Sequence, residues 1–321
     1  MATFVITATL SAAAIYLLRM FIKGKRFSEM VNAKDKVVII TGASSGIGKQ
    51  LTRELNLRGA KVYMFCRDED KTFQARLDLV RYGCDPTRMT YIHCDLSDIF
   101  SIKKAVDDFK KEEPVLDILI NNAGIMYYPD FKLTNDNCEL TWQTNYLGHF
   151  VLTELLIPYL EKSDDGRIIN VSSGSEHRCK ELNLEKINSS EYFGRMDSYS
   201  RSKLAQVMHA IELTKRLRAN NPLTKITINS CEPGVVNTNI CRYTFLDIKF
   251  FNCLLAPVRW FFLKTSNDGA QCPLFLALSK KLYGISGKHF KDCAEKSNIN
   301  HLAMNEELCS ELYDYSLQYV N

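Results

Sequence analysis

Short apolar runs alternate along this chain with longer stretches of helical period. Continuous runs of β-branched and aromatic residues predict buried parallel strands, because a strand covered on both faces needs apolar side chains at every position. Between them, apolar residues recur every three or four positions, which predicts helices with one buried face. The predicted strands are 37–40, 61–66, 89–94, 116–120, 167–171, 226–230 and 287–290, and the predicted helices are 49–57, 70–82, 101–110, 141–160, 196–219 and 270–278.

This alternation of strands and helices predicts an α/β fold. A helix that joins two parallel strands makes a right-handed crossover, and repeated crossovers build a doubly wound sheet. A chain of 321 residues has room for one large α/β domain or two small ones. Because the alternation is unbroken, we expect a single Rossmann-type domain over residues 35–321 with a doubly wound parallel sheet.

The first 22 residues stand apart from this pattern. Residues 2–18 carry no charge, and four basic residues follow within the next eight positions. The run reaches the length of a short membrane span if Arg19 extends its charged end to the lipid surface. A signal peptide, which has its positive charge before the apolar run, and a helix lying on the membrane surface are the alternatives. The positive-inside rule favours an uncleaved anchor over 1–22 and a basic linker over 23–34, with the remaining chain in the cytosol.

Composition excludes several other classes of protein. The net charge of +4 is too small, and its basic residues too dispersed, to predict nucleic-acid binding. The eleven cysteines are irregularly spaced and form neither CxxC pairs nor groups with histidine. This usage indicates reduced, buried thiols in a cytosolic protein and predicts no metal site.

A glycine-rich turn, TGASSGIG, links the first predicted strand to the first predicted helix. Glycine permits the tight turn and leaves no Cβ in the path of a phosphate, and the helix N-terminus offers unpaired N–H groups. The spacing G-x-x-x-G-x-G differs from other phosphate-binding fingerprints, and a plain loop is the alternative. The expected cofactor-binding residues of this turn are Gly42, Ser44, Ser45, Gly46, Ile47 and Gly48.

The end of the second predicted strand bears on the choice of cofactor. In a dinucleotide-binding fold this strand end meets the adenosine ribose, where an acid binds the ribose hydroxyls and repels a 2′-phosphate. Here Cys66 occupies the acid's place and Arg67 follows. An Arg pairs with a phosphate, so Arg67 favours NADP(H) over NAD(H). The neighbouring acid Asp68 counts against a preference for NADP(H). The alternative is that Arg67 is only a solvated surface residue.

Polar side chains also follow the next two predicted strands. Asp95 and Leu96 come after the third strand, and Asp95 either accepts the adenine amino group or only caps a helix. The turn of Asn122, Ala123 and Gly124 follows the fourth strand, at the sheet edge where open α/β folds bind ligands.

Three later features are also candidates for function. Asn145 interrupts a long apolar helix, so it either fixes a kink or holds a functional water. Tyr199 and Lys203 are four residues apart and share one helix face. The aromatic stretch 245–262 is either a buried helix pair or, within a segment near 240–265, a lid that covers a substrate cleft and touches the bilayer.

Taken in order, these motifs resemble the short-chain dehydrogenase/reductase family over about residues 35–300. Within the family the chain most resembles the retinol dehydrogenase branch, through segments 65–68, 145–150, 170–173, 268–271 and 286–293. The motifs that carry the family resemblance are Thr41-Gly42-x-x-x-Gly46-Ile47-Gly48, Asn121-Asn122-Ala123-Gly124, Asn145, Ser173, Tyr199-x-x-x-Lys203 and Pro233-Gly234.

The resemblance implies a role for each of these residues. Tyr199 would exchange a proton with the substrate oxygen, which Ser173 would orient. Lys203 would favour the tyrosinate and bind the nicotinamide ribose, and Asn145 would hold a relay water. Backbone groups of Asn122, Ala123 and Gly124 would line the adenosine ribose, and Thr238 would contact the nicotinamide carboxamide or the phosphates. The other expected cofactor-binding residues are Tyr199, Lys203, Pro233, Gly234 and Val236.

The expected activity is interconversion of a lipophilic alcohol with its aldehyde or ketone, using NADP(H). Retinol and retinal are the leading substrates, and a steroid, a fatty aldehyde or a xenobiotic ketone is the alternative. A non-catalytic NADP(H)-binding protein is a further alternative from another class. The anchor and the resemblance predict a protein of the endoplasmic reticulum membrane whose catalytic domain faces the cytosol.

Overall fold

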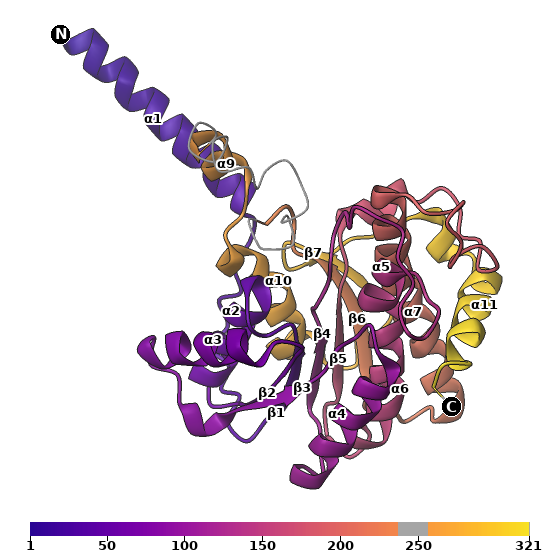
Figure 1. The fold of residues 1–321 in the computed structure, drawn as a ribbon. Coiled ribbons are helices and arrows are strands. Elements are labelled where there is room, and N and C mark those ends of the chain that lie inside the picture. The colour runs from indigo at the N-terminus through magenta and orange to yellow at the C-terminus, as the bar shows by residue number, and fades with distance from the viewer. Residues whose placement is uncertain (237–255, 321) are drawn as a thin grey trace.

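The computed structural model describes residues 1–236 and 256–320, and within them one sheet of eight strands forms the centre of the molecule (Figure 1). The strand order is β3-β2-β1-β4-β5-β6-β7-β8. β1 to β7 are parallel, and β8 pairs antiparallel with β7. The strands are β1 (Val37–Thr41), β2 (Lys61–Cys66), β3 (Met89–His93), β4 (Ile118–Asn121), β5 (Arg167–Val171), β6 (Thr227–Glu232), β7 (His289–Lys291) and β8 (Ala294–Glu295).

Helices cover both faces of this sheet. One layer holds α2 (Gly46–Leu57), α3 (Glu69–Arg81) and α10 (Ser266–Leu278), and the other holds α4 (Ile99–Glu112), α6 (Gly148–Leu160) and α7 (Arg195–Asn220), with α11 (Glu306–Leu317) packed on the outside of α7 (Figure 1). Successive strand residues supply opposite cores, so Val38 and Ile40 of β1 pack with the first layer and Ile39 with the second. The predicted Rossmann-type doubly wound sheet is confirmed.

Short helical turns join several of these elements. They are η1 (Pro86–Arg88), α5 (Leu140–Trp142), η2 (Gln143–Leu147), η3 (Gly174–Arg178), η6 (Lys280–Leu282) and η7 (His301–Met304). The helix expected over 141–160 is thus divided, because the π-helical turn η2 separates α5 from α6. The strand order reverses direction between β1 and β4. This switch point is where open α/β sheets bind ligands.

The N-terminal segment folds as the predicted helix, α1 (Ala2–Lys23), which projects away from the sheet beside α9 (Ala256–Phe262) (Figure 1). Among the described residues, none of the helices combines the length and apolar character needed to cross a bilayer. The helix is therefore confirmed, whereas its expected role as a membrane span is not. Arg19 also differs from expectation, since it is buried, donates to the Leu263 carbonyl at 2.8 Å and lies 5.7 Å from the Trp260 ring.

Two further expectations concern the aromatic segment and the cysteines. Residues 237–255 lie outside the described part, and they include Thr238 and most of the expected lid. In the described remainder, Trp260 and Phe262 of α9 are exposed, so this part is not a buried helix pair. The nine cysteines described are all free thiols, and all but Cys293 are buried, as the sequence predicts.

Candidate functional site

The glycine turn after β1 folds closely on itself. Gly42 and Gly46 have φ of +66° and +54°, which side chains rarely adopt. A Cβ on Gly48 would lie 2.3 Å from the Gly42 carbonyl oxygen, so only glycine fits there. Ser45 is the N-cap of α2, and within the described residues its hydroxyl makes no capping hydrogen bond. The first amides of α2 are therefore available to an anion such as a cofactor phosphate.

A second turn, after β4, is tied to this one by Thr41. The Thr41 hydroxyl accepts from the amides of Asn122 at 2.9 Å and Ala123 at 3.0 Å. It lies 2.8 Å from Nε2 of His149, whose Nδ1 lies 2.9 Å from the Asn145 carbonyl. Because a carbonyl only accepts, Nδ1 carries the proton and Thr41 donates to Nε2. Burial lowers the pKa of His149 to about 3, so the ring is neutral.

His149 had no role in the sequence-based prediction, although a signal was present. It lies four residues after Asn145, so the two share one face of a helix. In the structure it joins the helix that carries Asn145 to the turn that carries Asn122. His149 is thus a buried link between two predicted parts of the site.

Asn145 lies in the π-helical turn η2 and holds a neighbouring loop. Its Oδ1 accepts from the amide of Ile125 at 2.8 Å, and its Nδ2 donates to the Ile125 carbonyl at 2.9 Å and to Ser202 at 3.0 Å. Single π-helical turns occur often at functional sites. Of the two alternatives for Asn145, the local distortion of the helix is confirmed, and the water stays a prediction.

Tyr199 and Lys203 lie together on the buried face of α7. The Lys203 ammonium nitrogen is 5.8 Å from the centre of the Tyr199 ring. It donates to the Val171 carbonyl at 2.9 Å and to Gln206 Oε1 at 3.2 Å. Burial lowers the pKa of Lys203 to about 7. Gln206 also donates to the Asn145 carbonyl at 2.7 Å, so it connects two predicted catalytic residues, a link that the sequence-based prediction missed.

The two serines after β5 have different surroundings. Ser172 is buried, and its hydroxyl donates to the Lys203 carbonyl at 2.6 Å. Ser173 is half-buried, and its Oγ accepts from the amide of Ser175 at 3.2 Å as the N-cap of η3. Ser172 therefore anchors α7, and Ser173 is the more accessible hydroxyl; its role in orienting the substrate stays a prediction.

Arg67, at the end of β2, is free to meet a ligand. Its side chain is 62% exposed and lies 3.7 Å from the Asp95 carboxylate. Asp68 caps α3 by accepting from the amide of Lys71 at 2.9 Å, so this carboxylate already has a structural role. Asp95 accepts from Ser97, and the N-cap of α4 is Asp98. The helix-cap alternative for Asp95 is therefore wrong.

The loop after β6 returns to the glycine turn. Pro233 and Gly234 follow the strand, and Gly234 has φ of +84°. A Cβ on Gly269 of α10 would lie 2.7 Å from Val236 and 3.1 Å from Ile47, so both side chains pack against Gly269. Leu96, another predicted residue, is buried, and a Cβ on Gly124 would lie 3.2 Å from Asn145 Oδ1.

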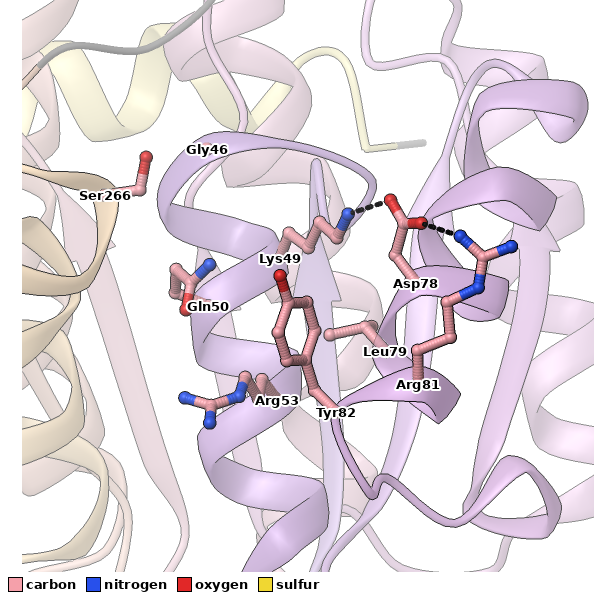
Figure 2. Close-up of a pocket in the computed structure, with 9 residues that line it drawn as sticks. All are labelled: Gly46, Lys49, Gln50, Arg53, Asp78, Leu79, Arg81, Tyr82 and Ser266. Atoms are coloured by element: carbon pink, nitrogen blue, oxygen red, sulfur yellow. Dashed lines mark hydrogen bonds and ion pairs between the residues drawn. The ribbon is translucent and has the colours of Figure 1, made fainter.

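A cavity of about 450 Å³ lies between α2, α3 and α10 (Figure 2). Inside it, the Asp78 carboxylate pairs with Lys49 at 2.7 Å and with Arg81 at 3.5 Å. Its lining residues are Gly46, Lys49, Gln50, Arg53, Asp78, Leu79, Arg81, Tyr82 and Ser266. Gly46 belongs to the phosphate turn, but none of the four predicted catalytic residues lines this cavity. We therefore do not assign the cavity to the substrate.

Comparison with known proteins decides the family. The family model described as short chain dehydrogenase matches residues 36–248, about two thirds of the chain. The chain belongs to the short-chain dehydrogenase family. This membership makes it an oxidoreductase acting on CH–OH groups, as the sequence motifs predict.

The relatives include several retinol dehydrogenases. The chain is 38% identical to retinol dehydrogenase 14 of Mus musculus over 88% of this chain and 84% of that protein. It is also 38% identical to human (Homo sapiens) retinol dehydrogenase 12, over 94% of this chain and 91% of that protein. Among solved structures, an uncharacterized protein from Mycobacterium paratuberculosis superposes with a TM-score of 0.72 at 28% identity, covering 92% of this chain and 97% of that one.

Proposed function

We propose that this protein is an NADP(H)-dependent oxidoreductase that interconverts a lipophilic alcohol with its aldehyde or ketone, with retinol and retinal as the leading pair. The observation that carries the proposal is the buried pair of Tyr199 and Lys203 on α7. It lies next to the end of β5, because Lys203 bonds the Val171 carbonyl. Retinol dehydrogenases are among the relatives at 38% identity, which supports the substrate class.

The side chains supply proton transfer and orientation. When bound, the nicotinamide supplies or accepts the hydride. Tyr199 gives a proton to the carbonyl oxygen during reduction and takes it back during oxidation. Positive charge on Lys203 favours the tyrosinate. Ser173 donates to the substrate oxygen and fixes its position beside Tyr199, and Asn145 holds the water through which Lys203 exchanges protons.

The cofactor would lie along the switch point of the sheet. Its phosphates would meet the amides of Ser45 and Gly46 at the start of α2, where Gly48 leaves room for the close turn. Arg67 would pair with the 2′-phosphate of NADP(H), since its side chain is exposed and its ion pair with Asp95 is long, at 3.7 Å. The 2′-phosphate would therefore have a basic partner one residue after Cys66, which occupies the position where NAD-specific proteins carry an acid.

We also propose that the protein associates with membranes of the endoplasmic reticulum through α1, with the catalytic domain in the cytosol. Exposed apolar side chains on α1 and α9, among them Leu17, Phe21 and Trp260, support this. The basic residues after α1 and the free thiols support a cytosolic domain. Flotation of the full chain with liposomes, compared with a chain beginning at residue 24, tests the association.

A substrate panel tests the proposed activity. We expect the purified protein to reduce all-trans-retinal with NADPH at a kcat/KM at least about tenfold above that for a small water-soluble aldehyde, because an apolar cleft gains energy from buried substrate area. Turnover of small soluble aldehydes alone would contradict the lipophilic substrate. A preference for a steroid or a fatty aldehyde would support the proposed chemistry but would replace retinal as the leading substrate.

A further inference from the structure

A cluster of charged and titratable side chains joins η3 to β6, β7 and the residue after β8. Two glutamates and two lysines form the centre of this cluster, and two histidines border it. Glu176 and Glu232 are both almost completely buried. Buried charges are costly unless they are paired, so their retention here calls for a role. The cluster consists of Glu176, His177, Glu232, His289, Lys291 and Lys296.

Glu232 ends β6, immediately before Pro233 and Gly234. Its carboxylate pairs with Lys291 at 2.7 Å and with Lys296 at 3.2 Å. Lys291 is its partner across the β6–β7 ladder. A Cβ on Gly174 would lie only 2.8 Å from Glu232 Oε2. The Glu232 carboxylate therefore lies in close contact with Gly174, the residue that follows Ser173.

Glu176 lies in η3, the turn that Ser173 begins. Its amide donates to the Ser173 carbonyl at 3.1 Å, and its own carbonyl accepts from Asn300 at 2.7 Å. The carboxylate oxygens have no hydrogen-bond partner among the described residues, although Lys296 lies at 3.8 Å and His177 Nε2 at 3.1 Å. Lys296 therefore stands between the two glutamates.

We propose that Glu176 and Glu232, bridged by Lys296, are positioning residues that hold the Ser173 turn against the loop beginning at Pro233. The first segment would orient the substrate oxygen and the second would hold the nicotinamide. The cluster then sets the spacing between substrate and cofactor without touching either one. The role of this cluster in catalysis rests on the proposed function. The coupling between the Ser173 turn and the loop beginning at Pro233 rests only on the contacts described above.

The charges around Glu176 make this coupling dependent on pH. Burial raises the pKa of Glu176 to about 7, whereas Lys291 and Lys296 hold the pKa of Glu232 below its usual value. Burial lowers the pKa of His289 to about 4 and also lowers that of His177, so both rings are largely neutral at pH 7. Glu176 is therefore the group of the cluster that titrates near neutrality.

Hydrogen exchange measured by mass spectrometry on the full chain tests the coupling. Glu232→Gln and Lys296→Met should each speed exchange in both peptides 172–179 and 231–236 by about tenfold or more, because each removes the ion pair between Lys296 and Glu232 that joins the two segments. The double variant should add little beyond the larger single effect. Lys288→Met is the control, since Lys288 lies just before β7 and its pair with Glu295 of β8 is exposed, and it should change neither peptide.

A second variant separates positioning from general stability. In the wild type, exchange of peptide 172–179, corrected for intrinsic rates, should change between pH 6 and 8, and Glu176→Gln should abolish that change. The proposal would be overturned if exchange became faster in 231–236 alone, or if Lys288→Met had an equal effect. It would also be overturned if Glu176→Gln kept the pH profile of the wild type.

Kinetics then connect the cluster to the proposed reaction. In Glu232→Gln, we expect kcat with NADPH and retinal to fall about tenfold while the Kd of NADPH changes less than about twofold, as expected when orientation rather than binding is lost. An unchanged kcat would contradict the role in catalysis. Absence of any turnover by the wild type would instead contradict the proposed function, and the exchange experiment would still decide the coupling.

Discussion

Replacing Arg67 by Ser tests the basis of cofactor choice. The substitution removes the positive charge at the end of β2 and keeps a small polar side chain that is compatible with a surface position. The cost to the fold should be small, because the pair with Asp95 is 3.7 Å long and largely exposed, and such pairs contribute about 0 to 1 kcal/mol. A change in cofactor affinity would therefore report on the 2′-phosphate.

The expected magnitude follows from the exposure of Arg67. A hydrogen bond to a charged group contributes about 1.5 to 3 kcal/mol. Because the Arg67 side chain is 62% exposed, solvent and salt screen the interaction toward the lower limit. We therefore expect the Kd of NADPH to rise about tenfold to thirtyfold, while the Kd of NADH, which lacks the phosphate, changes less than about twofold.

Fluorescence titration of both cofactors against the wild type and Arg67→Ser measures this difference directly. Arg81→Ser is a matched control, because Arg81 is also an exposed Arg with a carboxylate partner, Asp78, at 3.5 Å. Raising the salt concentration should reduce the preference of the wild type for NADPH. Equal loss of both cofactors, or an equal effect of Arg81→Ser, would refute the role given to Arg67.

Three further predictions address the turns and the buried groups. Gly48→Ala should lower the affinity for NADPH by about tenfold or more and destabilise the fold by about 1 to 3 kcal/mol, because its Cβ would meet the Gly42 carbonyl at 2.3 Å; unchanged cofactor titration and thermal unfolding would contradict this. His149→Leu should lower the free energy of unfolding by about 1 to 3 kcal/mol, since it leaves buried groups unpaired, and urea unfolding would show it; a loss below about 0.5 kcal/mol would count against the link. Burial raises the pKa of Glu176 from 4.5 to about 7, so the folded state binds the proton more tightly and stability falls as pH rises across that window. The Tm of Glu176→Gln relative to the wild type should accordingly rise from pH 5 to pH 7 and level off above it, and a flat difference would contradict the buried titration.

The strands and the glycine turn could be predicted from sequence because their causes are local. A buried parallel strand needs apolar residues at consecutive positions, and β1, β2 and β5 carry them. The glycine turn needs residues without a Cβ at fixed spacing, and Gly42 and Gly48 show that need in the structure. The pairing of Tyr199 with Lys203 follows from helical period alone.

Other features depend on contacts between distant segments and left little trace in the sequence. The π-helical turn at Asn145 is stabilised by Ile125, Ser202 and Gln206 from other elements. β8 is two residues long, too short for a periodic signal. The sequence-based prediction also omitted α11, whose buried face packs on α7 through contacts that periodicity does not reveal.

Arg19, near the N-terminus, is another residue whose contacts could not be predicted from the local sequence. An apolar run that ends in a basic residue predicts a side chain reaching for the lipid surface. In the structure, Arg19 is covered by α9 and bonds the Leu263 carbonyl, some 240 residues away along the chain. Its partner could not be predicted from the local pattern, because the contact is made by a segment far away along the chain.

The most direct test of the central claim is NADPH oxidation by the full chain with all-trans-retinal, compared between the wild type and Tyr199→Phe. We predict retinal-dependent oxidation in the wild type and a loss of about 100-fold or more in the variant, since general acid catalysis contributes 10²–10⁴-fold. A Tyr199→Phe protein that reduces retinal at the wild-type rate would contradict the assignment of Tyr199 as the proton donor.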